Sequence, residues 1–245
     1  MSPRLTFAVA ARVLVQLRRD HRTLAMMLVL PCLLIALLWW MLRDLPGDRF
    51  QTFGPALLAM FPFIVMFLVT SVTTLRERSS GTLERLLAMP LGKGDFLGGY
   101  AVAFGLVAVL QSLLAVGTSV GLLGLDVEGA VWLLTVVAVA DALLGTALGL
   151  FVSAFARTEF QAVQFMPALV IPQILLCGLF VPRPALPSAL EAVSDVLPLS
   201  YAIDAMTTLV RSSDPGDVWA DVAVVLGFAV AGLALGAATL RRRTP

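Results

Sequence analysis

Long runs of apolar residues, separated by short polar segments, dominate the chain. A helix that crosses the hydrocarbon core of a bilayer needs about 20 mostly apolar residues. The runs do not alternate between apolar and polar residues, which favours helices over strands, and a helix closes its backbone hydrogen bonds within its own segment. The pattern predicts an all-α membrane protein, one domain over 1–245, with six transmembrane helices at 24–42, 50–75, 96–125, 129–156, 160–182 and 222–240.

The composition agrees with this pattern, because 59% of the residues are hydrophobic and only 13% are charged, against about 25% charged in soluble domains. The single histidine, His21, argues against a histidine-based metal site or a Ser/His/Asp triad within one chain. Cys32 and Cys177 both lie in apolar runs, where free thiols usually act as small packing residues. We therefore expect no metal site and no catalytic centre in this chain.

The distribution of Lys and Arg predicts the orientation. Five of these residues precede the first run, four lie in 76–95, one lies near 157 and three follow the last run, whereas four lie on the opposite side. Positively charged residues accumulate on the cytoplasmic side of a membrane. Both termini and the 76–95 loop are therefore predicted to be cytoplasmic, and the strong preference for Arg over Lys is typical of a GC-rich bacterial genome.

Residues 1–22 precede the first span and show a helical pattern. An apolar stripe runs beside a stripe of arginines and Gln16; its members are Leu5, Val9, Val13 and Leu17. This pattern predicts an amphipathic helix that lies in the cytoplasmic interface of the membrane. The helix either only anchors the chain or also takes part in signalling.

The segment 183–221 is too rich in prolines and apolar residues for a simple connector. Six prolines punctuate the fifth span and the residues after it: Pro167, Pro172, Pro182, Pro184, Pro187 and Pro198. Proline breaks helices, and broken helices at membrane depth need protein or water to cover the freed backbone. We predict one or two short helices that dip back into the outer leaflet as a re-entrant hairpin, before the sixth span returns to the cytoplasm.

Asp141 lies in the middle of the fourth span. A carboxylate at the bilayer centre costs about 2.5–3.5 kcal/mol on insertion scales, so this side chain should face the interior of the bundle. It either belongs to a translocation path or makes a packing hydrogen bond to a neighbouring Ser, Thr or Gln. Gly145 and Gly149 follow at helical spacing and predict a close helix contact.

Three glutamines in and near the fifth span leave a similar choice open. Gln161 and Gln164 begin the span and Gln173 lies within it. They either line a polar path or form hydrogen bonds between helices. The candidates for a translocation path are Asp141, Gln164, Gln173 and Tyr201.

The loop 76–95 combines a short amphipathic helix with a proline stop. Leu83, Leu86 and Leu87 repeat at helical spacing and Pro90 ends the pattern. Such a helix can lie on lipid headgroups or insert into a groove on a soluble partner. The nearby Gly92-Lys93-Gly94 lacks the spacing and the Ser or Thr of a phosphate-binding loop, which excludes a nucleotide site of that type here.

Two stretches carry a family resemblance. "RERSSGTLERLLAMPLGKGDFLGG" resembles the cytoplasmic segment of ABC-2 type exporter permeases, and "PLSYA", after a proline-rich fifth span, resembles a second element of that family. The matching positions of the first stretch are Glu77, Arg78, Gly81, Thr82, Leu83, Glu84, Leu86, Leu87 and Pro90. The six-span layout extends the resemblance over the whole chain, which is most similar to the daunorubicin-type drug-resistance branch. Gly99 departs from the pattern, since many members have Lys there.

The resemblance implies a transport subunit without an ATPase site of its own. The nine positions of the first stretch would form a coupling helix that docks on a separate ATP-binding subunit, and residues 1–22 would be the connecting helix beside it. Two ATP-binding subunits, which hold ATP and Mg²⁺, and a second permease copy would complete the complex, with no cofactor in this chain. The substrate would be an amphipathic drug, antibiotic or lipid, exported across a bacterial plasma membrane.

Two other classes of protein fit less well. A stand-alone secondary transporter or channel predicts inverted internal repeats, and residues 1–125 and 126–245 show no such similarity. An intramembrane enzyme needs clustered polar groups at membrane depth, whereas the spans hold one Asp and scattered Ser.

Overall fold

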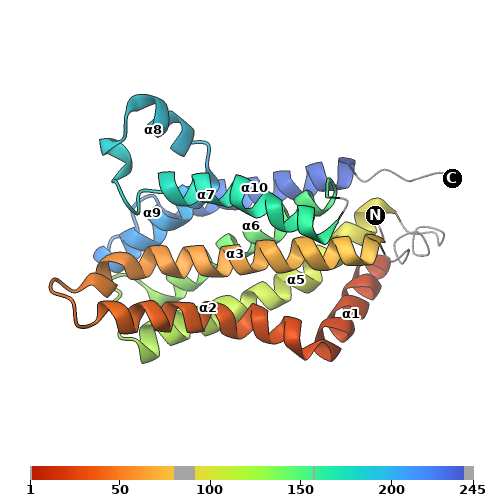
Figure 1. Ribbon diagram of the computed structural model, residues 1–245, viewed down its shortest axis with the longest axis horizontal. Coiled ribbons are helices and arrows are strands. Elements are labelled where there is room, and N and C mark those ends of the chain that lie inside the picture. Colours follow the sequence, from red (N-terminus) through yellow and green to blue (C-terminus); the bar gives the residue numbers. More distant parts are fainter. Residues whose placement is uncertain (1, 80–91, 157, 240–245) are drawn as a thin grey trace.

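The computed structural model describes residues 2–79, 92–156 and 158–239, and within these ranges the chain is helical and has no strand (Figure 1). The helices that make up the bundle are α1 (Pro3–Arg19), α2 (His21–Leu42), α3 (Arg49–Ser79), α5 (Lys93–Val116), α6 (Val131–Ser153), α7 (Glu159–Leu176), α9 (Pro198–Arg211) and α10 (Val218–Thr239). Three shorter elements are the π-helix η1 (Gly117–Leu122), the 3₁₀-helix η2 (Arg183–Ala185) and α8 (Ser188–Ser194).

Six of the described helices are long and apolar enough to cross a membrane: α2, α3, α5 with η1, α6, α7 and α10. They correspond one for one to the six predicted spans, which confirms an all-α, multi-pass membrane protein. Figure 1 shows these helices side by side along the long axis of the molecule, with α1 at one end and α8 towards the other.

Helices α3 and α6 form the centre of the bundle and approach each other closely. A Cβ atom at Gly145 would lie 2.5 Å from the carbonyl oxygen of Phe63, and one at Gly149 would lie 2.5 Å from that of Phe67. Only glycine allows this separation, so the close helix contact predicted from the glycine spacing is confirmed. Asp141, one turn before Gly145 on α6, is also buried.

Prolines do not end the helices in which they lie. Helix α7 continues through Pro167 and Pro172 and ends at Leu176, six residues before the predicted end of the fifth span. The helix ends where Gly178 adopts a φ of +88°, a left-handed conformation that glycine adopts at little cost. The predicted boundary at 182 is therefore wrong, because the backbone leaves the helix at this glycine.

Two short helices follow, as the proline pattern predicts. Helix α8 is mostly exposed and stands away from the bundle in Figure 1. Helix α9 is amphipathic, and its buried face, which includes Leu199, Ile203 and Met206, packs against α3, α6 and α10. The segment between the fifth and sixth spans is thus partly built into the helix bundle.

The amphipathic helix at the N-terminal end is present as α1, but its apolar stripe has a different use from the predicted one. Val9, Val13 and Leu17 are buried in a cluster with residues of α5. This stripe is therefore occupied by protein and is not free to face lipid. Phe7 and Val15 are the exposed large apolar side chains of α1.

Candidate functional site

A polar junction joins three helices at the two ends of the segment that resembles a coupling helix. Helix α3 leads into this segment, α5 follows it, and α1 packs against α5 (Figure 1). The junction contains two carboxylates, Glu77 near the end of α3 and Asp95 in the first turn of α5.

Glu77 is the centre of the first set of contacts, with only 6% of its surface exposed. Arg12 of α1 donates a hydrogen bond from Nη2 to Oε1 over 2.9 Å, and the Tyr100 hydroxyl of α5 donates to Oε2. A buried carboxylate is costly unless it is paired and hydrogen-bonded. The two donors meet this requirement, and they attach the end of α3 to both α1 and α5.

Asp95 makes the second set of contacts. Its carboxylate accepts hydrogen bonds from the backbone N–H of Gly92 (3.1 Å), from the backbone N–H of Ser2 (2.7 Å) and from the Thr6 hydroxyl (3.3 Å). An acidic side chain in the first turn of a helix satisfies free N–H groups and interacts favourably with the helix dipole. Asp95 therefore caps α5 and also fixes the start of α1 to it.

Gly99 explains how closely α1 approaches α5. A Cβ atom at this position would lie 2.5 Å from Cγ1 of Val9 and 2.9 Å from the Thr6 carbonyl oxygen. Gly99, which departs from the family pattern, is thus the position at which α1 packs directly against the backbone of α5. The long side chain expected there from the resemblance has no room in this structure.

An ion pair connects the same end of α3 to α7. Arg76 binds the Glu159 carboxylate through two hydrogen bonds, from Nε to Oε1 (3.0 Å) and from Nη2 to Oε2 (3.1 Å). Both side chains are exposed, so the pair contributes little to stability although its geometry is bidentate. The pair is a surface contact between these two helices.

Most of the predicted coupling residues lie outside the described residues, as does the predicted short helix: Gly81, Thr82, Leu83, Glu84, Leu86, Leu87 and Pro90. Glu77 is described in full, and Arg78 is described only as part of the α3 backbone. The predicted loop limits of 76 and 95 are too wide, because α3 continues to Ser79 and α5 begins at Lys93. The contacts of Glu77 and Asp95 hold these polar ends in helical form.

Asp141 faces the interior of the bundle, as its cost in a membrane requires. It is completely buried, and neither carboxylate oxygen has a hydrogen-bond partner in the part of the chain that the structure describes. Among the described residues, the packing hydrogen bond to a Ser, Thr or Gln side chain is therefore not formed. A role in translocation stays a prediction, and in this conformation the side chain has no contact with solvent.

The other candidates for a translocation path separate into two groups. Gln164 is exposed on α7. Gln173 is buried and accepts a hydrogen bond from the Leu199 N–H of α9 over 3.3 Å, which confirms a hydrogen bond between helices. Tyr201, two residues further along α9, donates its hydroxyl hydrogen to the Asp195 carbonyl oxygen over 2.7 Å. The structure therefore places Gln173 at the α7–α9 contact, Tyr201 against the residue that follows α8, and Gln164 on an exposed face of α7.

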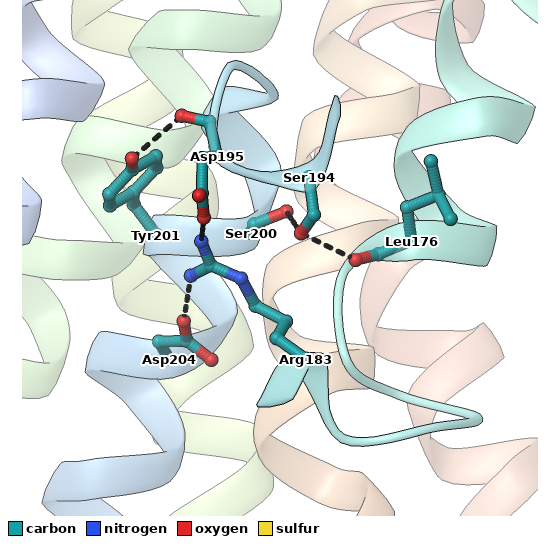
Figure 2. Close-up of polar contacts among 7 residues, drawn as sticks. All are labelled: Leu176, Arg183, Ser194, Asp195, Ser200, Tyr201 and Asp204. Carbon is teal, nitrogen blue, oxygen red and sulfur yellow. Dashed lines mark hydrogen bonds and ion pairs between the residues drawn. The ribbon is translucent and has the colours of Figure 1, made fainter. Parts of the chain in front are cut away.

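Arg183 is the centre of a polar cluster that the sequence analysis missed (Figure 2). Its two terminal nitrogens bind the carboxylates of Asp195 and Asp204, and its guanidinium carbon lies 5.2 Å from the centre of the Tyr201 ring. Burial raises the pKa of the Asp204 carboxyl, although the hydrogen bond and charge of Arg183 lower it. The only sequence signal was an arginine between two prolines directly after an apolar run.

Ser194 reinforces this cluster from the end of α8. Its hydroxyl donates to the Leu176 carbonyl oxygen over 2.8 Å and lies 3.2 Å from the Ser200 hydroxyl oxygen (Figure 2). These contacts tie the end of α7, the end of α8 and the start of α9 together. The cluster thus fixes the short helices between the fifth and sixth spans.

Comparisons with known proteins agree with this architecture. The family model described as "ABC-2 type transporter" matches residues 4–210. ABC transporter G family member 20 of Dictyostelium discoideum is 27% identical over 194 residues, which cover 76% of this chain and 26% of that protein. Probable multidrug ABC transporter permease YbhR of Escherichia coli (strain K12) is 29% identical over 150 residues, which cover 61% of this chain and 41% of YbhR.

A further relative is linearmycin resistance permease protein LnrN of Bacillus subtilis (strain 168), which is 23% identical over 193 residues, 73% of this chain and 48% of LnrN. The chain spans about a quarter to a half of the length of these curated relatives. The family match covers most of the helix bundle, including both polar ends of the coupling segment. The chain therefore belongs to the ABC-2 type transporter family.

Proposed function

We propose that this chain is the membrane-spanning permease subunit of an ATP-driven exporter. A separate ATP-binding subunit would bind the segment 80–91, and its closure on ATP would move the helices on either side. Family membership supports this proposal, as do relatives whose names describe multidrug and resistance permeases.

The observation that carries the proposal is the shared attachment of both ends of the coupling segment. Glu77, just before the segment, binds Arg12 of α1, and Asp95, just after it, binds Thr6 of α1 and Ser2 directly before this helix. A displacement of the segment would therefore move α1, α3 and α5 together rather than bend a free loop. This is the mechanical property that a coupling element needs.

The complete transporter would contain two ATP-binding subunits, with their ATP and Mg²⁺, and a second copy of this chain or a similar permease. The charge distribution supports an orientation in which the junction and both termini would lie in the cytoplasm of a bacterial cell. Helix α1 would then lie at the cytoplasmic headgroups, and the segment from α8 to α9 would re-enter the outer leaflet. An amphipathic drug, antibiotic or lipid would be the substrate.

Affinity purification from the native membrane, followed by mass spectrometry, tests the proposal. The wild-type chain should retain an ATP-binding subunit in near-equimolar amount. Changing Leu83, Leu86 and Leu87 together to alanine should remove this partner and abolish export while membrane insertion is unchanged.

A matched control changes three leucines that are exposed on α5, Leu106, Leu110 and Leu113, to alanine. This variant loses the same number of side-chain atoms from an apolar surface away from the coupling segment, and it should keep the ATP-binding subunit. Retention of the subunit by the coupling-segment variant, or purification of the wild-type chain alone, would overturn the proposal.

A further inference from the structure

A cavity of about 540 Å³ lies beside the Arg183 cluster. Its walls come from the start of α3, the loop after α7, α8 and α9, and they include the apolar side chains Phe53, Leu179 and Ile203. This volume lies within the range of about 300–1,000 Å³ that is typical of small-molecule sites. The cavity is therefore large enough for a ligand with an apolar body.

The charged groups of the cavity wall are unequal in number. Three carboxylates, those of Glu191, Asp195 and Asp204, face two guanidinium groups, those of Arg183 and Arg211. The wall thus has a formal surplus of one negative charge, and a positively charged ligand would neutralise it.

The hydrogen bonds show the same surplus. Arg183 occupies one oxygen of Asp195 and one of Asp204, while the second oxygen of each has no donor among the described residues. Both oxygens of Glu191 are also without a described donor. Four carboxylate oxygens are therefore still able to accept a hydrogen bond. The donors that remain in the cavity wall are the buried Nε of Arg183 and the exposed side chain of Arg211.

We propose that this cavity binds amphipathic cations, with the cationic group at the carboxylates and the apolar body against α3 and α9. Arg183 acts as a built-in counter-ion, and a bound cation displaces it from one of its two carboxylates. An anionic ligand would meet the surplus of carboxylates and is disfavoured.

The position of the cavity gives the site a place in transport, and this step rests on the proposed function. Phe53 in the cavity wall and Glu77 in the junction both belong to α3, 24 residues apart, which corresponds to about 36 Å along a helix. The cavity therefore lies at the end of the bundle opposite the coupling segment. A cation bound there has reached the release side of the exporter.

Binding is measured with a matched pair of fluorescent probes on the purified full chain in nanodiscs of uncharged phosphatidylcholine at pH 8. The cationic probe is 4-(4-dimethylaminostyryl)-N-methylpyridinium, and the neutral probe is the same molecule without the N-methyl group. Empty nanodiscs give the lipid background. The wild-type chain should bind the cation at least about tenfold more tightly than the neutral probe, because only the cation is attracted by the charge of the surplus carboxylate.

Two variants with opposite expected effects separate binding from folding. Asp204→Asn removes a carboxylate and should weaken cation binding about tenfold, whereas Arg183→Gln releases both aspartates and should strengthen it. The control Asp44→Asn changes an aspartate on the α2–α3 loop whose side chain is 82% exposed and which is no part of the cavity wall, and it should bind as the wild type does.

Equal binding of the two probes, unchanged binding by Asp204→Asn, or no binding to the wild-type chain would each overturn the proposal. Should Arg183→Gln fail to elute as a folded protein, Asp204→Asn and Asp44→Asn still decide. The measurement needs no ATP-binding subunit, so its failure leaves the co-purification test of the proposed function intact, and failure of that test leaves the cation site intact.

Discussion

The junction at Glu77 and the cluster at Arg183 use the same types of residue in opposite arrangements. At the junction, one arginine and one tyrosine converge on a single carboxylate, which is 6% exposed. At the cluster, two carboxylates and one tyrosine surround a single arginine, and the aspartate side chains are 56% and 42% exposed.

This difference has a physical consequence. The junction pairs a buried carboxylate on α3 with donors from α1 and α5, so it is suited to holding these three helices together. The cluster leaves carboxylate oxygens without donors beside a cavity, so it is suited to exchanging one cation for another. Substitutions at each of the two regions should therefore have different effects.

Gly99→Ala should disrupt the junction most strongly. The added methyl group overlaps Val9 and the Thr6 carbonyl oxygen, and relief requires α1 to move away from α5. Overpacking of this kind costs about 1–3 kcal/mol of unfolding free energy. Thermal unfolding in detergent measures it, and Gly227→Ala in α10, where a methyl group meets nothing within 4 Å, is the control. Equal melting temperatures for the two variants would contradict the close approach of α1.

Arg12→Leu should cost about 2 kcal/mol, since Glu77 is buried and would lose the charged partner of its carboxylate. The value is below that of a fully buried pair because the Arg12 side chain is 36% exposed. Arg12→Lys should restore part of the loss. Arg4→Leu, at an exposed arginine of the same helix, is the control in the same unfolding measurement. An equal loss of unfolding free energy in Arg4→Leu would show that the positive charge of α1, rather than the contact with Glu77, stabilises the protein.

The pH dependence of stability should report on Asp204. Its pKa is raised in the folded protein by burial, so the folded state binds more protons than the unfolded state and stability falls as pH rises from the ordinary aspartate pKa through the raised one. Arg183 and Asp195 are the charged neighbours that act on this group, and the carboxylate of Asp221 on α10 interacts with it at longer range. Unfolding curves over pH 3–7 should therefore have a smaller downward slope in Asp204→Asn. An unchanged slope would remove Asp204 as the source.

Arg76→Ala should have the smallest effect, at most about 0.5–1 kcal/mol, because its ion pair with Glu159 is exposed. High salt should reduce the difference from the wild type further. A double-mutant cycle with Glu159→Ala measures the pair directly. A coupling energy as large as the Arg12 effect would place α7 within the rigid junction.

The sequence was sufficient for the features that depend on local pattern. Apolar run length located all six spans, and the spacing of Gly145 and Gly149 predicted a close helix contact, although only the structure identifies α3 as the partner of α6. Glu77 was found through the family motif, but its partners Arg12 and Tyr100 are 65 and 23 residues away along the chain. No local pattern reports such distant pairing.

Other features required the three-dimensional arrangement. The apolar stripe of α1 could face lipid or pack against protein. It packs against α5 because Gly99 has no side chain and lets α1 approach. In the Arg183 cluster, the arginine binds aspartates that lie 12 and 21 positions later in the chain. The positions of the prolines did not show how the chain turns back to bring these residues together. The end of α7 was missed because Gly178, rather than a proline, ends the helix.

The α3–α6 contact restricts how this chain can change over evolutionary time. At Gly54, the nearest obstacle to a new methyl group is the side chain of Leu125, so a smaller residue at 125 can compensate for a larger one at 54. At Gly145 and Gly149, the obstacle is a backbone carbonyl oxygen, which every amino acid carries. No second substitution restores the lost space, and both glycines are therefore fixed for as long as these two helices remain in contact.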